Sequence, residues 1–120
     1  MSRIPYLIAG LAALVAIAAP TSAGMGTTKL KGTTGPGFTI TLKKGTAAVR
    51  TVKAGRYSIT VNDKSTMHNF RIKGPGLNKQ ITSLPFKGTK TVTVTLKKGK
   101  YTYQGDPHVL QGMKKTFRVT

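Results

Sequence analysis

Residues 101–113 read Tyr-Thr-Tyr-Gln-Gly-Asp-Pro-His-Val-Leu-Gln-Gly-Met, and the prediction of both fold and site starts from them. The two tyrosines alternate with threonine, which is the period of a β-strand. A tight Asp-Pro-His turn follows, and it places His108 five residues before Met113. The chain has only one other histidine, His68, in the sequence Met-His-Asn-Phe. Two imidazoles and a thioether are side chains that bind soft or borderline metal ions.

The rest of the chain repeats the same two-residue alternation. In residues 89–96, Val92, Val94 and Leu96 alternate with threonines, as in a strand with one buried face. Similar patterns predict strands at residues 38–42, 47–52, 56–61, 66–73, 89–96, 101–103 and from about 114 onwards. Turns rich in Gly, Pro and Lys separate them, and no helical period is sustained after residue 23. This pattern predicts an all-β protein, an antiparallel β-sandwich.

His68 falls in one of these predicted strands. It shares its parity with Phe70 and Ile72, so its imidazole should point to the same side as core residues. A histidine in such a place is either a hydrogen-bonded core residue or a ligand. Met113 is equally open, because methionine commonly fills irregular gaps in a core.

The turn with His108 and Met113, together with the earlier His68-Asn69-Phe70, resembles the copper site of the small blue copper proteins, the plastocyanin-like cupredoxins. In that family the loop reads Cys-x-x-His-x-x-x-x-Met. The resemblance covers about residues 38–120, and it implies a Greek-key β-sandwich. It also implies a copper site with His68, His108 and Met113 as ligands. The same alignment puts Gly105 at the position of the family's cysteine, and the chain contains no cysteine.

The resemblance assigns supporting roles around this site to three residues, Asn69, Asp106 and Pro107. In the family, the residue after the first histidine forms a hydrogen bond across to the ligand loop, although Asn69 could also be a surface amide. Asp106 is either an ordinary turn residue or a substitute oxygen ligand. Pro107, Val109 and Leu110 would form either an apolar docking patch for electron transfer or the packing of a cap. Without the Cys side chain, we expect a gap that a small thiol, imidazole or anion could enter.

The chain divides into three predicted segments. Residues 1–23 have the pattern of a secretory signal, with Arg3, an apolar run and a Thr-Ser-Ala cleavage site. The alternative is a retained membrane anchor, for which the apolar run is short. Residues 24–37 are predicted to form an extended lead-in, and residues 38–120 the cupredoxin-like domain. We therefore expect a secreted or extracytoplasmic monomer with no transmembrane segment in the mature chain.

The charge is strongly one-sided, with 20 Lys and Arg against 2 acidic residues and a formal net charge of +18. Such a balance favours anionic partners: a cell-envelope polyanion, a lipid headgroup, nucleic acid or an acidic redox partner. Nucleic acid is disfavoured, because the strand aromatics share their parity with core residues and would not be free to stack on bases. The basic residues are spread over turns and outward strand positions, which also fits a solvated surface.

With only two acidic residues, the chain has few side chains that could act in acid–base catalysis, so we do not expect an enzyme. The sequence predicts an exported copper-binding module with an incomplete type 1 site, which binds copper weakly or as Cu(I). Electron transfer is the role of the family, but an ordinary blue electron carrier is not expected without the thiolate. The alternative is a metal-free structural or polyanion-binding β-sandwich of the cell envelope.

Overall fold

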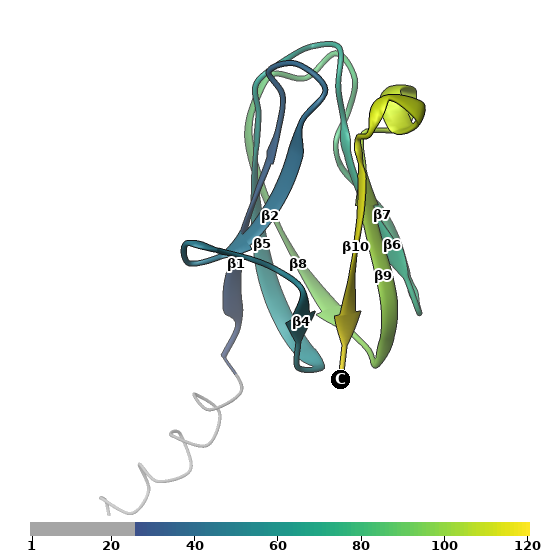
Figure 1. Cartoon of the computed structure of the whole chain (residues 1–120). Helices are drawn as coiled ribbons and strands as arrows, with labels where there is room; N and C mark the ends of the chain where they lie inside the picture. Colours follow the sequence, from purple (N-terminus) through teal and green to yellow (C-terminus); the bar gives the residue numbers. More distant parts are fainter. Residues whose placement is uncertain (1–25) are drawn as a thin grey trace, which may run out of the picture.

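A computed structural model of the chain describes residues 26–120, and these form a two-layer β-sandwich (Figure 1). The first sheet has the strand order β3-β2-β1-β5-β8, and the second has the order β4-β10-β9-β6-β7. The strands are β1 Thr28–Thr34, β2 Ile40–Lys44, β3 Ala47–Ala48, β4 Thr51–Val52, β5 Gly55–Asp63, β6 Phe70–Gly74, β7 Leu77–Thr82, β8 Gly88–Leu96, β9 Gly99–Gln104 and β10 Lys114–Val119. One 3₁₀ helix, η1 (Asp106–Gln111), joins β9 to β10. The predicted all-β sandwich is confirmed.

The antiparallel part of that prediction needs a correction, because both sheets are mixed. Strand β1 pairs with β5 in parallel, and β10 pairs with β4 in parallel. The other pairings are antiparallel, including the long ones of β5 with β8 and of β9 with β10. A parallel pair requires a crossover between its strands, and short-range alternation carries no signal for that.

The start of the domain was also placed too late by the sequence. Residues 28–34, predicted as a lead-in, form β1 in the middle of the first sheet, between β2 and β5. Leu30 is buried, and the missing side chain of Gly32 leaves room for the ring of Phe70 from the facing sheet. A Cβ atom on Gly32 would lie 2.8 Å from that ring. The sandwich therefore begins at β1 and not at Phe38.

The core lies between the two sheets and follows the predicted alternation. In β5, Tyr57, Ile59 and Val61 are buried, while the residues between them are more exposed. In the second sheet, the rings of Phe70 and Tyr103 stack with centroids 5.7 Å apart, and Tyr101 stacks on Phe117 at 5.5 Å. Each of these aromatic residues is buried and shares its parity with the core residues of its own strand, as expected, and together they cover the inner face of the second sheet.

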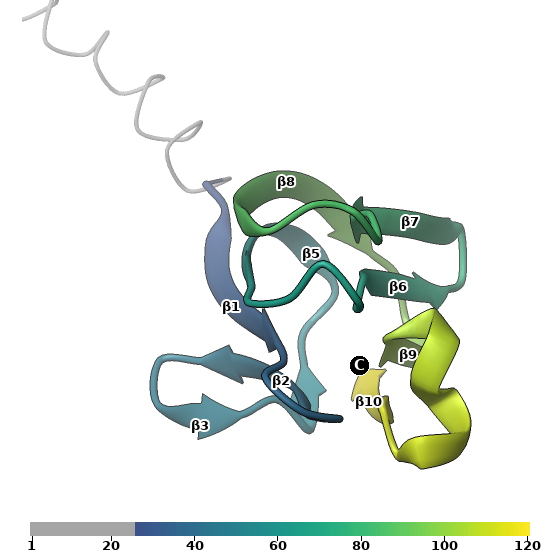
Figure 2. The same ribbon diagram turned by 90° about the horizontal axis from the view of Figure 1, so that it is seen from above.

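The loops at one end of the sandwich carry the residues of interest (Figures 1 and 2). The β1–β2 loop, the β5–β6 loop and η1 meet at this end, and the C-terminus lies at the opposite end. The predicted signal segment, residues 1–23, lies outside the described residues. No helix within residues 26–120 is long and apolar enough to cross a membrane.

Candidate metal centre

The loop between β9 and β10 is closed by backbone hydrogen bonds at its base. The N–H of Gly105 donates to the carbonyl of Met113 at 2.9 Å, and the N–H of Met113 donates to the carbonyl of His108 at 3.1 Å. Between them the chain forms η1, with Pro107 near its start and Gly112 at its end. Gly112 has φ +98°, a left-handed conformation that suits glycine. Where the sequence predicted a tight turn, the loop is a short helix that presents His108.

His68 lies in the loop before β6, and not within a strand as predicted. Residues 66 and 67 form a turn, and β6 begins only at Phe70. The backbone N–H of His68 donates to the carbonyl of Ser65 at 3.4 Å. Its side chain is nevertheless buried, with an exposed fraction of 4%. Asn69, which has the opposite parity, is also buried, so two-residue alternation does not extend to this loop.

The structure brings the two histidines together. Nδ1 of His68 lies 3.2 Å from Nδ1 of His108, and the ring centroids are 4.9 Å apart with the planes at 80°. This contact is a hydrogen bond in which one of the two Nδ1 atoms carries the proton. These residues are 40 positions apart in the sequence, and the two loops that hold them come from different strand pairs.

Phe38 completes this cluster, and the sequence did not point to it. Its ring lies 4.7 Å from the ring of His108 and 6.3 Å from that of His68, centroid to centroid. Phe38 was expected to begin a strand, but β2 starts at Ile40 and Phe38 is 53% exposed in the loop before it. A large apolar side chain directly after Gly-Pro-Gly was the only signal in the sequence.

Met113 is fully buried, and it fills the space beside Gly105. A Cβ atom built on Gly105 would lie 2.9 Å from Cε and 3.3 Å from Sδ of Met113. The expectation of an open gap at Gly105 is therefore wrong, because the thioether occupies this volume. Both interpretations of Met113 remain compatible with this position, since the same side chain packs the core and presents sulfur near the loop.

Asn69, which follows His68, connects the β5–β6 loop to the loop between β9 and β10 through hydrogen bonds. It is 1% exposed, and its Oδ1 accepts a hydrogen bond from the backbone N–H of Asp106 at 2.7 Å. Its Nδ2 donates to Oδ2 of Asp106 and to Oε1 of Gln80, both at 2.9 Å. Asn69 is thus a buried bridge to the loop that holds His108 and not a surface amide.

Asp106 is held by three donors on the side of the second sheet. Its Oδ2 accepts from Asn69 and from Nε of Arg71 at 2.9 Å, and its Oδ1 accepts from Nε2 of Gln104 at 2.9 Å. Partial burial opposes ionisation of this carboxyl group. The hydrogen bonds from Gln104, Arg71 and Asn69 and the charge of Arg71 outweigh it and lower the pKa. These three donors hold Asp106 in place, so its carboxylate anchors the loop to the second sheet.

The imidazole pair passes a simple test of fit for a metal ion. Two nitrogens bound at about 2.0–2.1 Å to one ion in tetrahedral geometry are about 3.3 Å apart. The observed separation of 3.2 Å is compatible with this value, and it is equally the length of the hydrogen bond between the two rings. No group of three or more His, Cys, Asp or Glu side chains that could bind a metal occurs in residues 26–120. Met113 carries a thioether sulfur at the end of the loop that holds His108.

Among the solved structures with a similar architecture is a copper protein. The chain is similar to the copper protein rusticyanin, with a TM-score of 0.57, 17% identity and coverage of 77% of this chain and 76% of that one. Rusticyanin from Thiobacillus ferrooxidans gives a TM-score of 0.53 at 19% identity over 77% and 76% of the two chains. Reduced rusticyanin gives 0.53 at 20% identity over 77% and 78%. Neither a protein-family model nor a curated protein matches the sequence. The chain has a cupredoxin-like fold.

Several apolar side chains are exposed at the histidine end of this cupredoxin-like sandwich. Leu110 in η1 is 97% exposed, and Met67 beside His68 is 65% exposed. Pro107 is exposed as well, and Val109 is half-buried. Leu110 therefore contributes nothing to packing of a cap, so the cap interpretation is wrong for this residue.

Proposed function

We propose that this chain is an exported copper-binding module that uses an incomplete type 1 site without a thiolate. The observation that supports this most is the convergence of the two Nδ1 atoms of His68 and His108 at a distance of 3.2 Å. They are the only two histidines of the chain, and they meet at the end of a cupredoxin-like sandwich.

The donor set favours Cu(I). His68 and His108 would supply two borderline nitrogens, and Met113 would supply one soft thioether sulfur. Gly105 stands where the resemblance places the cysteine, so the thiolate that makes a blue centre is absent. Bound copper would supply single-electron redox chemistry. The residues of this chain bind and orient: the backbone bonds of the loop and the Asn69 bridge fix His108 relative to His68.

The residues around the two histidines determine which side of the site solvent and partner molecules can reach. His68 is buried, whereas His108 is half-buried and covered on one side by Phe38. An incoming copper carrier or redox partner would therefore reach the site from the side of His108. The exposed Met67 and Leu110 provide apolar surface for such a partner at the same end.

The test is a calorimetric titration with Cu(I) and Cu(II), run in parallel with a His68→Ala/His108→Ala double variant. We expect one equivalent of Cu(I) to bind the parent and neither oxidation state to bind the double variant. A ligand that binds only the folded state stabilises it, by about 2.7 kcal/mol at a hundred times its dissociation constant. Copper should therefore also raise the thermal midpoint of the parent alone. Absence of binding, or equal binding by the variant, would contradict the proposal.

A further inference from the structure

Three neighbouring hollows run around the edge of the sandwich where β2 lies opposite β10. The first, about 260 Å³, lies over outward residues of β1 and β2, and the second, about 380 Å³, opens between the two sheets. The third, about 310 Å³, lies over outward residues of β9 and β10. Thr41 and Lys43 line both the first and the second hollow, and Arg50 and Thr116 line both the second and the third. The hollows are therefore neighbours, and together they extend around this edge from the outer face of one sheet to the outer face of the other.

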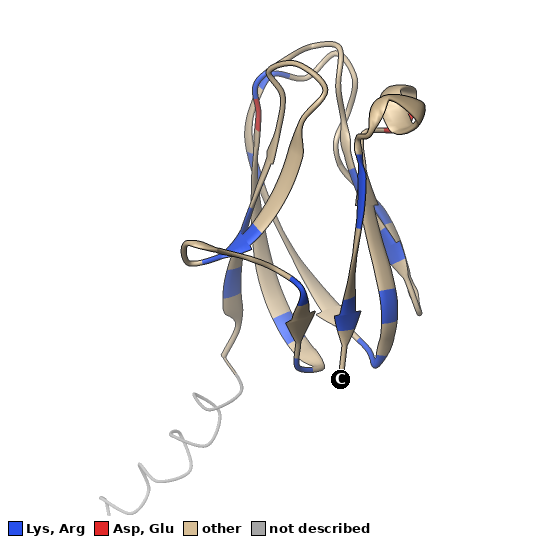
Figure 3. Ribbon diagram, viewed as in Figure 1, with Lys and Arg blue, Asp and Glu red and all other residues tan. Residues whose placement is uncertain are grey.

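Basic side chains line all three hollows, and we call this part of the surface the basic belt. Its cationic residues are Lys31, Lys43, Arg50, Lys100, Lys115 and Arg118, all of them exposed. No carboxylate lines any of the three hollows. Figure 3 shows the acidic residues elsewhere, and they are Asp63 at the end of β5 and Asp106 in η1.

The strand register adds an independent observation. Cross-strand neighbours of like charge repel each other and destabilise a sheet. Among the strand pairs of residues 26–120, two basic residues stand directly opposite each other twice, as Lys31 with Lys43 and as Lys100 with Arg118. Both pairs belong to the belt, one at each end of it. The fold thus concentrates unneutralised repulsion along this belt.

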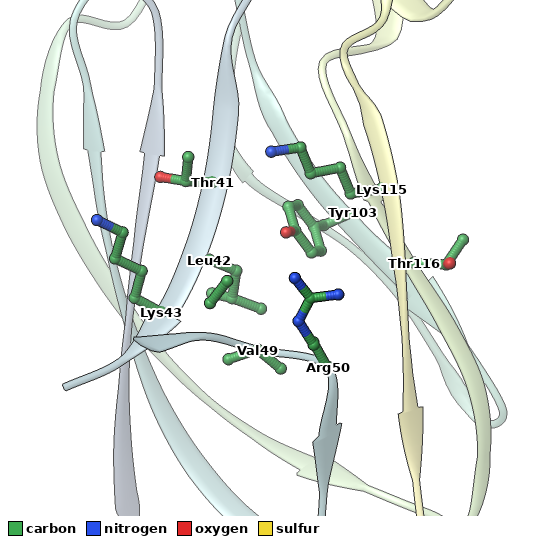
Figure 4. Close-up of a pocket in the computed structure, with 9 residues that line it drawn as sticks. Thr41, Leu42, Lys43, Val49, Arg50, Tyr103, Lys115 and Thr116 are labelled. Atoms are coloured by element: carbon green, nitrogen blue, oxygen red, sulfur yellow. The ribbon is translucent and has the colours of Figure 1, made fainter. Parts of the chain in front are cut away.

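In the middle of the belt, too, basic side chains lie near one another. Lys115 shares its parity with the buried Phe117 and Val119, yet it is exposed, and it lines the second hollow. In Figure 4 the amino group of Lys115 and the guanidinium of Arg50 lie on either side of Tyr103 in the space between the sheets. An inward lysine can protect a strand edge from aggregation. Edge protection does not account for the two repelling pairs on the outer faces.

We propose that the basic belt binds a linear polyanion, a flexible chain with regularly repeated phosphate or carboxylate groups. Such a chain can follow the belt from one face, around the edge, to the other face. A planar membrane surface cannot contact both faces at once. The aromatic residues that line the hollows, Tyr103 and Phe117, are only 3% exposed and offer no face for stacking on nucleobases. The belt would therefore recognise the spacing of negative charges along the polyanion. This inference does not depend on copper binding.

The test compares two variants with the same loss of charge. The belt variant is Lys31→Gln/Lys100→Gln/Lys115→Gln, and the control is Lys64→Gln/Lys79→Gln/Lys87→Gln, which replaces exposed lysines outside the three hollows. Binding of linear polyphosphate and of polygalacturonate is measured by calorimetry at several salt concentrations. We expect the belt variant to lose at least tenfold more affinity than the control and to show a weaker dependence on salt. The polymer that binds more tightly identifies phosphate or carboxylate as the preferred group.

Further measurements separate this proposal from its rivals. Equal losses in both variants would overturn it, because they would mean diffuse attraction without a site. Inorganic phosphate that binds as tightly as polyphosphate would overturn the linear chain in favour of a single-ion site. Tighter binding of an oligothymidylate than of polyphosphate at equal charge would show that bases are recognised, and would also overturn it. A higher thermal midpoint of the free belt variant than of the control at low salt would support relief of the repulsion.

The His68→Ala/His108→Ala variant keeps the two proposals apart. It should bind polyphosphate as the parent does, since neither histidine lines the belt. A parallel loss of polyanion binding in this variant would contradict a site on the belt.

Discussion

At the scale of single residues, the most informative position is Gly105. Its backbone has φ −102° and ψ 105°, an extended conformation that any residue adopts. Glycine is therefore not required here by the backbone. Two neighbours oppose a side chain here: the flexible end of Met113, 2.9 Å from a built Cβ, and the backbone carbonyl oxygen of Asn69, 3.3 Å from it.

Gly105→Cys should convert the site into a blue copper centre. The new thiolate would join the two imidazoles and the thioether, which is the ligand set of type 1 copper. We expect an intense visible charge-transfer band with Cu(II) in this variant and none in the parent, measured by absorption spectroscopy. Gly105→Ala is the matched control, because it displaces Met113 equally without supplying sulfur. Copper binding by the Cys variant without the band would mean that the three ligand positions do not converge with residue 105.

Asp106 gives a prediction for the dependence of stability on pH. Its pKa in the folded state lies below the ordinary value of 3.8, so its ionised form stabilises the fold. This contribution is complete above about pH 5 and is lost as the pH falls through the lowered pKa. Asp106→Asn should therefore be less stable than the parent at pH 7, with a difference that narrows towards pH 2. Denaturant unfolding at several pH values measures it, and a difference that does not change with pH would contradict the role of the charge.

The residues of the site show what a sequence can and cannot reveal. Spacing and resemblance identified His68, His108 and Asn69 as neighbours, and the structure brings all three to one end of the sandwich. Phe38 was missed because its contact joins two loops that share no periodic pattern. The partners of Asp106 were missed for a related reason: Arg71 and Gln104 reach it across the pairing of β6 with β9, and only the three-dimensional register reveals that.

At the scale of elements, the strands with strong alternation were predicted and the others were not. Strands β5, β8, β9 and β10 match the predicted ranges closely. Strand β1 was missed because Leu30 is its only large apolar residue, and its place depends on parallel pairing with β5. Strand β7 was missed because three of its residues in a row are polar and exposed at the sheet edge. In both, pairing with a neighbour determines the strand, and local alternation does not show it.

Tyr101 joins two turns at the end of the sandwich opposite the histidines. Its hydroxyl donates to the carbonyl of Pro75 at 2.7 Å and accepts from the N–H of Lys97 at 2.9 Å. Its ring packs directly on Gly74, where any Cβ would clash with it. The β6–β7 turn and the β8–β9 turn are therefore fixed to each other through one fully buried side chain.

Tyr101→Phe should cost about 1–2 kcal/mol of unfolding free energy, because it leaves one donor and one acceptor without their partner. Tyr57→Phe is the matched comparison, since the Tyr57 hydroxyl makes a single bond, to the carbonyl of Lys53 at 2.6 Å. We expect its cost to be smaller. Urea unfolding of the two variants gives both values, and an equal or smaller loss for Tyr101→Phe would show that water replaces its two hydrogen bonds.

At the scale of the whole molecule, uncompensated charge is the dominant feature. The chain carries +18, and the described residues contain one ion pair, Arg71 with Asp106. Repulsion among so many like charges opposes the compact state. The cupredoxin-like core must offset this cost, and a bound polyanion on the basic belt would relieve part of it. In the free protein, charge repulsion thus lowers the stability, whereas burial of the core raises it.

Added salt should therefore stabilise the protein. The screening length falls from about 30 Å at 0.01 M to about 8 Å at 0.15 M, so repulsion between distant lysines is largely removed over this range. A gain of about 1 kcal/mol would raise the thermal midpoint by about 4–8 °C for a domain of this size. Calorimetry in sodium chloride measures it, and sodium sulfate at equal ionic strength is the comparison. Equal effects of the two salts indicate screening alone, whereas a larger effect of sulfate indicates anions bound at sites such as the basic belt. A midpoint that falls with salt would mean that attraction between Arg71 and Asp106 outweighs the repulsion among the other charges.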